Sequence, residues 1–342
     1  MLVVVFGAGA SYDSVDRANL RPGLNEWQLQ RQPPLADDLF GNRAVFGDTV
    51  GRYGVAAALM SDVRRAVGRG VPVETALELH NERSMSSPRL RQQLAAVRFY
   101  LQDMLTECSL WPQAGNGLTN YADLVDAIEE WRVTTGESVT YVTFNYDTIL
   151  EQACTQQLGW EFRDIGSYLG WRGTSLIKVH GSVTWAHPVA GPGPDRGDRD
   201  WRKNEMIRLV DQLEFSRDDF ALVANAEPTT GDGRWAFPAL AIPLASKSAF
   251  ECPQAHVAEV RLSLAKATRL LLIGWRAADE PFLRLMADAL MPGCRVQVVA
   301  GSDAAPIVDR LTNARIPIGE THVETGGFTR FVAGKEWSWL FS

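Results

Sequence analysis

The sequence has few cysteines and lacks both a long apolar run and a long basic run. Cys108, Cys154, Cys252 and Cys294 stand singly, so ligand spacing excludes a four-thiolate zinc site. Isolated thiols are typical of a reducing compartment, and no apolar run approaches the ~18 residues of a membrane helix. Acidic residues outnumber basic ones by 41 to 34, a formal net charge of −7, which argues against nucleic acid or an anionic membrane as the main partner. The sequence therefore predicts a soluble, cytoplasmic protein that needs no metal.

What is present is enough apolar material for a large core. The chain has 342 residues, 46% of them hydrophobic, which fits two domains or one large α/β domain with an insertion. Apolar, β-branched runs predict strands at residues 2–6, 138–144, 175–179, 269–273 and 295–299. Helices are expected at about 148–158, with Asp147 as N-cap, and at about 279–290. This alternation predicts an α/β fold with a Rossmann-like, doubly wound parallel sheet.

Two stretches do not fit that sheet. Residues of about 52–132 lack strand patterns and show helical spacing, as at Leu94, Val97 and Leu101, which predicts a helical insertion. Residues of about 186–236 are rich in proline, glycine and mixed charge, which predicts an irregular insertion with a short helix near 203–213. We therefore expect one domain over residues 1–301 with both insertions, followed by a C-terminal tail, 302–342, packed on it.

Four predicted strands end in small or polar residues. These ends are Gly7-Ala8-Gly9-Ala10-Ser11, Asn145-Tyr146-Asp147, His180-Gly181-Ser182 and Gly274-Trp275. Because parallel strands place their carboxyl ends at one edge, where open α/β sheets bind ligands, we expect the four segments to meet there. The Gly-x-Gly turn would let backbone N–H groups approach a phosphate, although Tyr12 replaces a third glycine and an ordinary tight turn is the alternative.

Each polar side chain at these ends has a structural alternative. Asn145 would hold a carboxamide or a water, or would instead form an Asx-turn. Asp147 is better explained as a helix cap than as a catalyst. His180 lies at the expected rim, with His187 as the competing histidine. Trp275 would either stack on a bound ring or belong to the core.

Five short segments in sequence order resemble the sirtuin-like domains of bacterial anti-phage defence systems. They are Val4-Val5-Phe6-Gly7-Ala8-Gly9-Ala10-Ser11, Pro33-Pro34-Leu35-Ala36-Asp37-Asp38-Leu39-Phe40, Thr143-Phe144-Asn145-Tyr146-Asp147, Lys178-Val179-His180-Gly181-Ser182-Val183 and Leu271-Leu272-Ile273-Gly274-Trp275. The resemblance spans about residues 3–300. It implies that residues 1–301 are a sirtuin-like, NAD-binding catalytic domain.

The resemblance also implies a role for each matched residue. Asn145 and His180 match the catalytic asparagine and histidine. The remaining matches imply cofactor binding. The loop that holds the NAD diphosphate and ribose corresponds to Gly7, Ala8, Gly9 and Ser11. A pocket residue corresponds to Asp147, and a glycine turn near the adenosine half corresponds to Gly274. Protein-deacetylating sirtuins share parts of this pattern but carry a four-cysteine zinc module that this sequence lacks.

The resulting hypothesis is an NAD⁺ hydrolase that cleaves the nicotinamide–ribose bond and needs no metal. A histidine, with a usual pKa of about 6.5, suits a general base near neutral pH. The alternatives are a deacylase or ADP-ribosyltransferase at the same cofactor site, and a regulatory module that binds NAD or ADP-ribose without turnover. The resemblance implies an effector that is switched on in a homo-oligomer or by a regulatory partner protein.

Overall fold

A six-stranded parallel sheet forms the larger of two lobes. The structure is a computed structural model that describes residues 1–191, 197–244 and 249–342. The sheet has the strand order β3-β2-β1-β7-β8-β9, with every neighbouring pair parallel. Its strands are β1 (Leu2–Phe6), β2 (Val139–Thr143), β3 (Thr174–Lys178), β7 (Arg269–Ile273), β8 (Cys294–Ala300) and β9 (Ile318–Thr325). The predicted doubly wound α/β sheet is confirmed.

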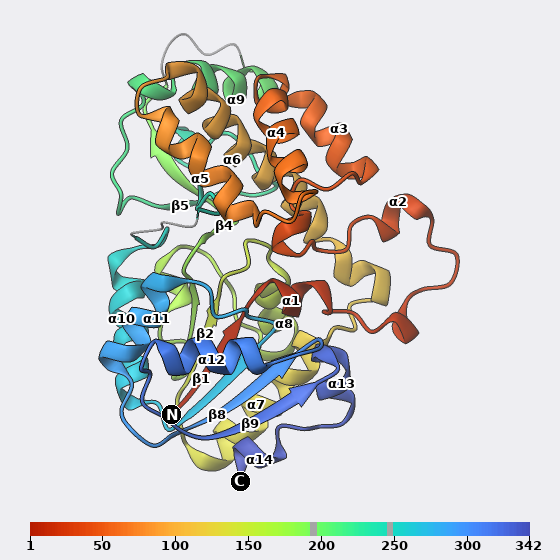
Figure 1. The fold of residues 1–342 in the computed structure, drawn as a ribbon, viewed down its shortest axis with the longest axis vertical. Coiled ribbons are helices and arrows are strands. Elements are labelled where there is room, and N and C mark those ends of the chain that lie inside the picture. The colour runs from red at the N-terminus through yellow and green to blue at the C-terminus, as the bar shows by residue number, and fades with distance from the viewer. Residues whose placement is uncertain (192–196, 245–248) are drawn as a thin grey trace.

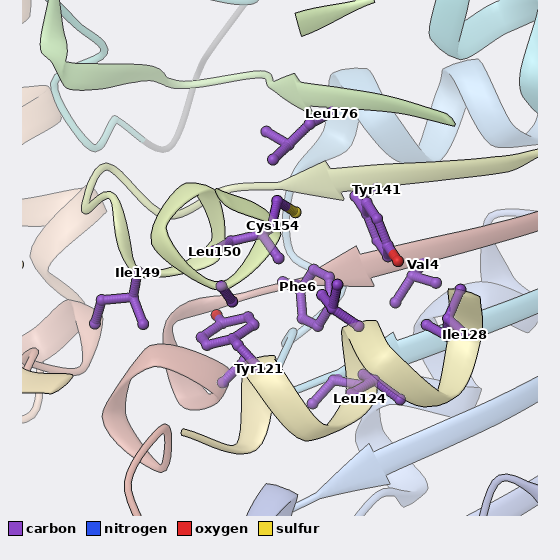
Figure 2. Close-up of a cluster of buried hydrophobic side chains, with 14 of the residues drawn as sticks. Val4, Phe6, Tyr121, Leu124, Ile128, Tyr141, Ile149, Leu150, Cys154 and Leu176 are labelled. Carbon is purple, nitrogen blue, oxygen red and sulfur yellow. The ribbon is translucent and has the colours of Figure 1, made fainter. Parts of the chain in front are cut away.

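Helices cover both faces of this sheet. One face packs against α7 (Asn120–Thr135), α8 (Ile149–Leu158), α13 (Gly327–Ala333) and α14 (Ser338–Phe341), and the other against α10 (Gln254–Lys266), α11 (Glu280–Ala289) and α12 (Ala305–Asn313). All five residues of β1 are buried because its side chains alternate between the two layers. Figure 2 shows Val4 and Phe6 of β1 beside Leu124 and Ile128 of α7. We call this assembly the sheet lobe.

The second lobe combines helices with a small antiparallel sheet. It contains α3 (Ala44–Arg52), α4 (Ala57–Val67), α5 (Val73–Ser84), α6 (Pro88–Cys108), α9 (Arg199–Arg208), β4 (Gly181–Val189), β5 (Ala221–Leu222) and β6 (Trp235–Leu240). The sheet order is β5-β4-β6, and buried residues of α6 pack on β4 and β6. Figure 1 shows this helical lobe above the sheet lobe. The carboxyl end of β1 is directed toward the helical lobe. The short helices α1 (Ala8–Tyr12) and α2 (Glu26–Leu29) lie near the junction.

The observed boundaries differ from the predicted insertions. The helical insertion, predicted at about 52–132, begins earlier, with α3, and ends with α6, because α7 covers the main sheet. The irregular insertion, predicted at about 186–236, contains paired strands and a ten-residue helix, α9, at Arg199–Arg208 rather than at 203–213. Residues 192–196 of that insertion lie outside the described residues. The segment from 302 to 342 packs on the domain and also supplies the sixth strand, β9.

β9 was missed for a physical reason. It is an edge strand of partly exposed residues, Ile-Gly-Glu-Thr-His-Val-Glu-Thr, so it lacks the continuous apolar run of a buried parallel strand.

All four cysteines are buried free thiols. Among the described residues, no helix has the length and apolar character needed to cross a membrane.

Candidate active site

The strand order places a crossover reversal between β1 and β7. From β1 the chain continues to β2 and β3 on one side, and later returns to β7, β8 and β9 on the other. Open α/β sheets bind ligands beyond the carboxyl ends of the strands at such a reversal. Phe6 pairs in register with both Thr143 and Ile273, and Thr143 pairs with Lys178. The four predicted segments therefore leave the same edge of the sheet.

Three glycines pack against one another where β1 and β7 end. A Cβ on Gly7 would lie 2.6 Å from the Gly274 carbonyl oxygen, and one on Gly9 would lie 2.9 Å from the Gly274 Cα. Gly274 has a φ of +59°, and its Cβ would lie 2.2 Å from the Ala10 backbone nitrogen. Close backbone contact therefore requires glycine at all three positions, whatever else they bind.

The backbone N–H groups of this turn are largely used within the protein. Gly7 N–H donates to the Ile273 carbonyl, Gly9 N–H to the Gly274 carbonyl, and Ala10 N–H to the Gly7 carbonyl, at 2.9–3.0 Å. Only the Ala8 N–H, among Gly7, Ala8, Gly9 and Ala10, has no protein acceptor within the described residues. The diphosphate-binding role of Gly7, Ala8, Gly9 and Ser11 stays a prediction, as does the adenosine-side role of Gly274.

Asn145 is anchored to the glycine turn by its side-chain amide. Its Nδ2 lies 2.9 Å from the Gly7 carbonyl, 2.8 Å from Ser11 Oγ and 3.2 Å from the Tyr121 hydroxyl. The side chain is buried, and its Oδ1 has no protein donor among the described residues. This orientation, inferred from hydrogen bonding, leaves Oδ1 as the group that would accept from a ligand or a water.

Tyr121 joins this network from α7 and was not identified from the sequence. Its hydroxyl also lies 3.1 Å from Ser11 Oγ, and burial raises its pKa, so it stays neutral near pH 7. Its one sequence indication is weak: it lies in the first turn of a helix that begins at the same edge.

Asp147 and Lys178 shape the loop that carries Asn145. Asp147 Oδ1 accepts from Ile149 N–H at 3.1 Å, so Asp147 serves the start of α8, although the N-cap residue is Thr148. Lys178 is fully buried, donates to the Asp147 carbonyl and pairs with Glu151 at 3.0 Å. Burial raises the pKa of the Glu151 carboxyl, and Lys178 opposes that rise. The pocket role of Asp147 remains a prediction.

His180 is paired with a carboxylate that the sequence analysis took only as the start of a helix. His180 Nε2 lies 2.8 Å from Asp279 Oδ2, and both side chains are largely buried. The other oxygen of Asp279, Oδ1, accepts from Phe282 N–H at 3.0 Å as the N-cap of α11. The cap fixes the carboxylate, and the carboxylate orients the ring. Asp279 lies 99 residues from His180, so sequence spacing gave no indication of the pair.

Aromatic rings hold His180 in place. The Phe144 ring meets the His180 ring edge-on at 5.0 Å and stacks on Trp275 at 5.2 Å. Trp275 is buried and also contacts Phe282, so it belongs to the core, which was one of its two interpretations. Tyr146 joins the lobes, because its hydroxyl donates to the Ala241 carbonyl and its own carbonyl accepts from Val183 N–H.

His187, the competing histidine, lies in the helical lobe with both ring nitrogens bonded. Nδ1 lies 3.0 Å from the Asp219 carbonyl, and Nε2 lies 2.7 Å from Glu251. Burial alone would raise the pKa of Glu251, but hydrogen bonds and charge from His187 and Arg98 lower it to about 2. These two hydrogen bonds explain His187 structurally.

Within the described ranges, no group of three His, Cys, Asp or Glu side chains is placed to hold a metal ion. No protein-family model matches the sequence, and no curated protein matches it either. Solved structures similar to the chain include a Sir2 homolog–NAD complex, at 12% identity, a TM-score of 0.41, and coverage of 98% of this chain and 90% of that one.

Two other similar structures bear related descriptions. A mutant Sir2 homologue in complex with 2′-O-acetyl ADP ribose has 11% identity, a TM-score of 0.42, and coverage of 98% and 93%. Sir2 in complex with the inhibitor EX-527, 2′-O-acetyl-ADP-ribose and a deacetylated p53 peptide has 12% identity, a TM-score of 0.41, and coverage of 100% and 95%. The function proposed below rests on residues of this chain.

Proposed function

We propose that this protein is an NAD⁺ hydrolase that uses water to cleave the nicotinamide–ribose bond, giving nicotinamide, ADP-ribose and a proton. One observation carries the proposal: at the crossover reversal, an anchored Asn145 and a carboxylate-paired His180 leave the same sheet edge. These are the two residues that the resemblance to sirtuin-like defence domains matches to catalytic positions.

Asn145 would position the attacking water or a ribose hydroxyl. Its Nδ2 is held by Gly7 and Ser11, so Oδ1 is fixed in direction as an acceptor. Fixing the nucleophile in line with the bond that breaks lowers the entropic part of the barrier. Nicotinamide departs as a neutral molecule, so cleavage of its bond to the ribose needs no proton donor. The site has only to position the nucleophile.

His180 would accept the proton of the nucleophile. With Nε2 hydrogen-bonded to the Asp279 carboxylate, the neutral ring carries its hydrogen on Nε2, and Nδ1 is the basic nitrogen. Asp279 is then a positioning residue that also stabilises the imidazolium formed when His180 takes the proton.

The direct test incubates purified protein with NAD⁺ and measures nicotinamide and ADP-ribose by chromatography. Equal amounts of both products without an added acceptor support the hydrolase. Nicotinamide release only in the presence of an acyl-lysine peptide or a protein acceptor would establish a transferase or deacylase instead. Binding of NAD⁺ without any nicotinamide release, in every oligomeric state tested, would establish a non-catalytic module.

We also propose that the activity is gated, as a cytoplasmic effector of anti-phage defence would need, because free NAD⁺ hydrolysis depletes a cofactor of the host. The junction of the lobes supports this, since Arg276 follows the Gly274 turn and pairs with Asp37 of the Pro33–Phe40 segment at 3.0 Å. Size-exclusion fractions assayed for nicotinamide should show low turnover in the monomer and a large rise in an oligomer or partner complex. Full turnover by a dilute monomer would overturn the gating.

A further inference from the structure

A hollow of about 310 Å³ lies between α8 and the loop that precedes α7. None of the predicted catalytic or cofactor-binding residues lines it. Its volume lies at the lower end of the ~300–1,000 Å³ typical of ligand pockets. It therefore has room for a small metabolite and belongs to no function described so far.

The walls of the hollow are fixed by three hydrogen bonds, two between backbone groups and one from a side chain. The loop closes on itself where Gly117 N–H donates to the Pro112 carbonyl at 2.8 Å, and Arg21 N–H ties its own segment to the Ala114 carbonyl at 2.8 Å. On the opposite wall, Gln152 Nε2 donates to the Ser109 carbonyl at 2.8 Å. The hollow is thus a built feature of the fold, formed by three segments that are distant in sequence.

Its lining combines a largely apolar surface with several polar side chains that have no partner elsewhere in the described residues. The Arg21 guanidinium and the carboxamides of Gln113, Asn116 and Gln156 make no side-chain hydrogen bond or ion pair within the described residues. No carboxylate lines the hollow, although the chain has a net charge of −7. The hollow therefore carries one positive charge, that of Arg21, and no negative charge.

A second, smaller hollow of about 30 Å³ shares Arg21 and Gln113 with the first. It adds Arg31, whose guanidinium is fixed by Glu107 through Nε at 3.1 Å and Nη2 at 2.9 Å. Arg21 therefore stands between the two hollows with a second cation on the far side. An anionic group at Arg21 would meet the charge of Arg21, since Glu107 already pairs with Arg31.

We propose that this hollow is a second ligand site, which takes a small phosphorylated nucleoside or sugar phosphate. The phosphate would bind Arg21, because guanidinium forms strong charge-assisted hydrogen bonds with phosphate oxygens. The polar ring of the ligand would meet Asn116 and Gln156, above the apolar floor formed by Ile149 and Ala153. The proposal does not depend on NAD⁺ hydrolysis.

The test is calorimetric titration of the full chain with AMP, ribose 5-phosphate and inorganic phosphate. We expect AMP or ribose 5-phosphate to bind more tightly than phosphate alone, and the tighter of the two identifies the ring. Arg21→Gln should weaken that binding about tenfold or more, since it removes the charge-assisted bond and leaves the backbone contact to Ala114 intact. Gln156→Glu, on an exposed helical position, should also weaken it by charge repulsion.

Arg17→Gln is the matched control, because Arg17 is exposed on the same segment and lines neither hollow. It should leave the affinity unchanged. Equal affinity in the wild type and the Arg21→Gln variant would overturn the proposal, because the ligand would then be bound elsewhere, for example at the strand-end site. Absence of binding by all three probes at about 1 mM, where even weak sites are occupied, would also overturn it.

Discussion

The two lobes both bury polar side chains, but they use them differently. In the helical lobe, Asp103 accepts from Lys203 at 2.6 Å and from the Tyr53 hydroxyl at 2.5 Å, with Arg52 at 3.1 Å. Both Asp103 oxygens are bonded, and burial is the main cause that lowers the pKa of Lys203 and raises that of Tyr53. At the sheet edge, by contrast, Asn145 keeps an acceptor directed away from its anchors.

The comparison shows how a buried polar group is recognised as structural or as a candidate for chemistry. A carboxylate surrounded by donors from its own lobe stabilises the packing of α3, α6 and α9, and has no lone pair directed elsewhere. Asn145 is different, because all three of its side-chain contacts hold Nδ2, and Oδ1 has no protein donor among the described residues. Four predictions on five variants, in order of decreasing expected effect, test this distinction.

The largest effect should come from His180→Ala and Asn145→Ala. Each should lower NAD⁺ hydrolysis by ~10²–10⁴-fold, as expected for loss of a general base or of a fixed nucleophile. Unfolding by urea should show that both variants remain folded. His322→Ala is the control, because His322 lies on the edge strand β9 and its side chain is 43% exposed. Turnover near that of the wild type in either variant would remove that residue from the mechanism.

Asp103→Ala should act on stability rather than on the chemistry. It leaves the Lys203 ammonium buried without its carboxylate, which typically costs about 3–5 kcal/mol of unfolding free energy. Asp62→Ala is the matched control, since the Asp62–Arg65 pair is exposed and should contribute at most about 1 kcal/mol. Urea titration measures both, and equal losses in the two variants would contradict the structural role of Asp103.

Gly274→Ala tests the packing beneath the site. The new Cβ would meet the Ala10 nitrogen at 2.2 Å in a left-handed backbone, so we expect a loss of about 2–4 kcal/mol from overpacking and strain. Gly51→Ala is the opposite case, because Gly51 lies inside α3 with open space around it. It should raise the unfolding free energy by about 0.5–1 kcal/mol. A stable Gly274→Ala variant would mean that the turn rearranges easily.

The pH dependence of the unfolding free energy should show the effect of burying His256. Burial lowers its pKa from 6.5 to about 4 in the folded protein. As the pH drops, His256 is therefore protonated in the unfolded chain before it is protonated in the folded protein. The unfolding free energy consequently falls between about pH 6.5 and pH 4. His256→Phe should reduce the loss between pH 7 and pH 4.5 by about 2–3 kcal/mol. Identical pH profiles for variant and wild type would contradict the assignment.

The sequence by itself determined the parallel sheet and the segments at its carboxyl edge. Buried parallel strands need continuous apolar runs, and the residues that follow those runs are fixed by chain order, so Asn145 and His180 could be named as candidates. The glycines could be named too, but not the reason for them, which is the contact of Gly7 and Gly9 with Gly274 across two strands.

Only the tertiary structure decided which side chains complete the site and where the lobes divide. Asp279 and Tyr121 reach His180 and Asn145 across 99 and 24 residues, and no local pattern encodes such a contact. The helices α6 and α7 have similar local periodicity, so only their packing partners place one in the helical lobe and the other on the sheet. Periodicity records that a helix has a buried face, whereas the surface that buries it is set by residues far away in the chain.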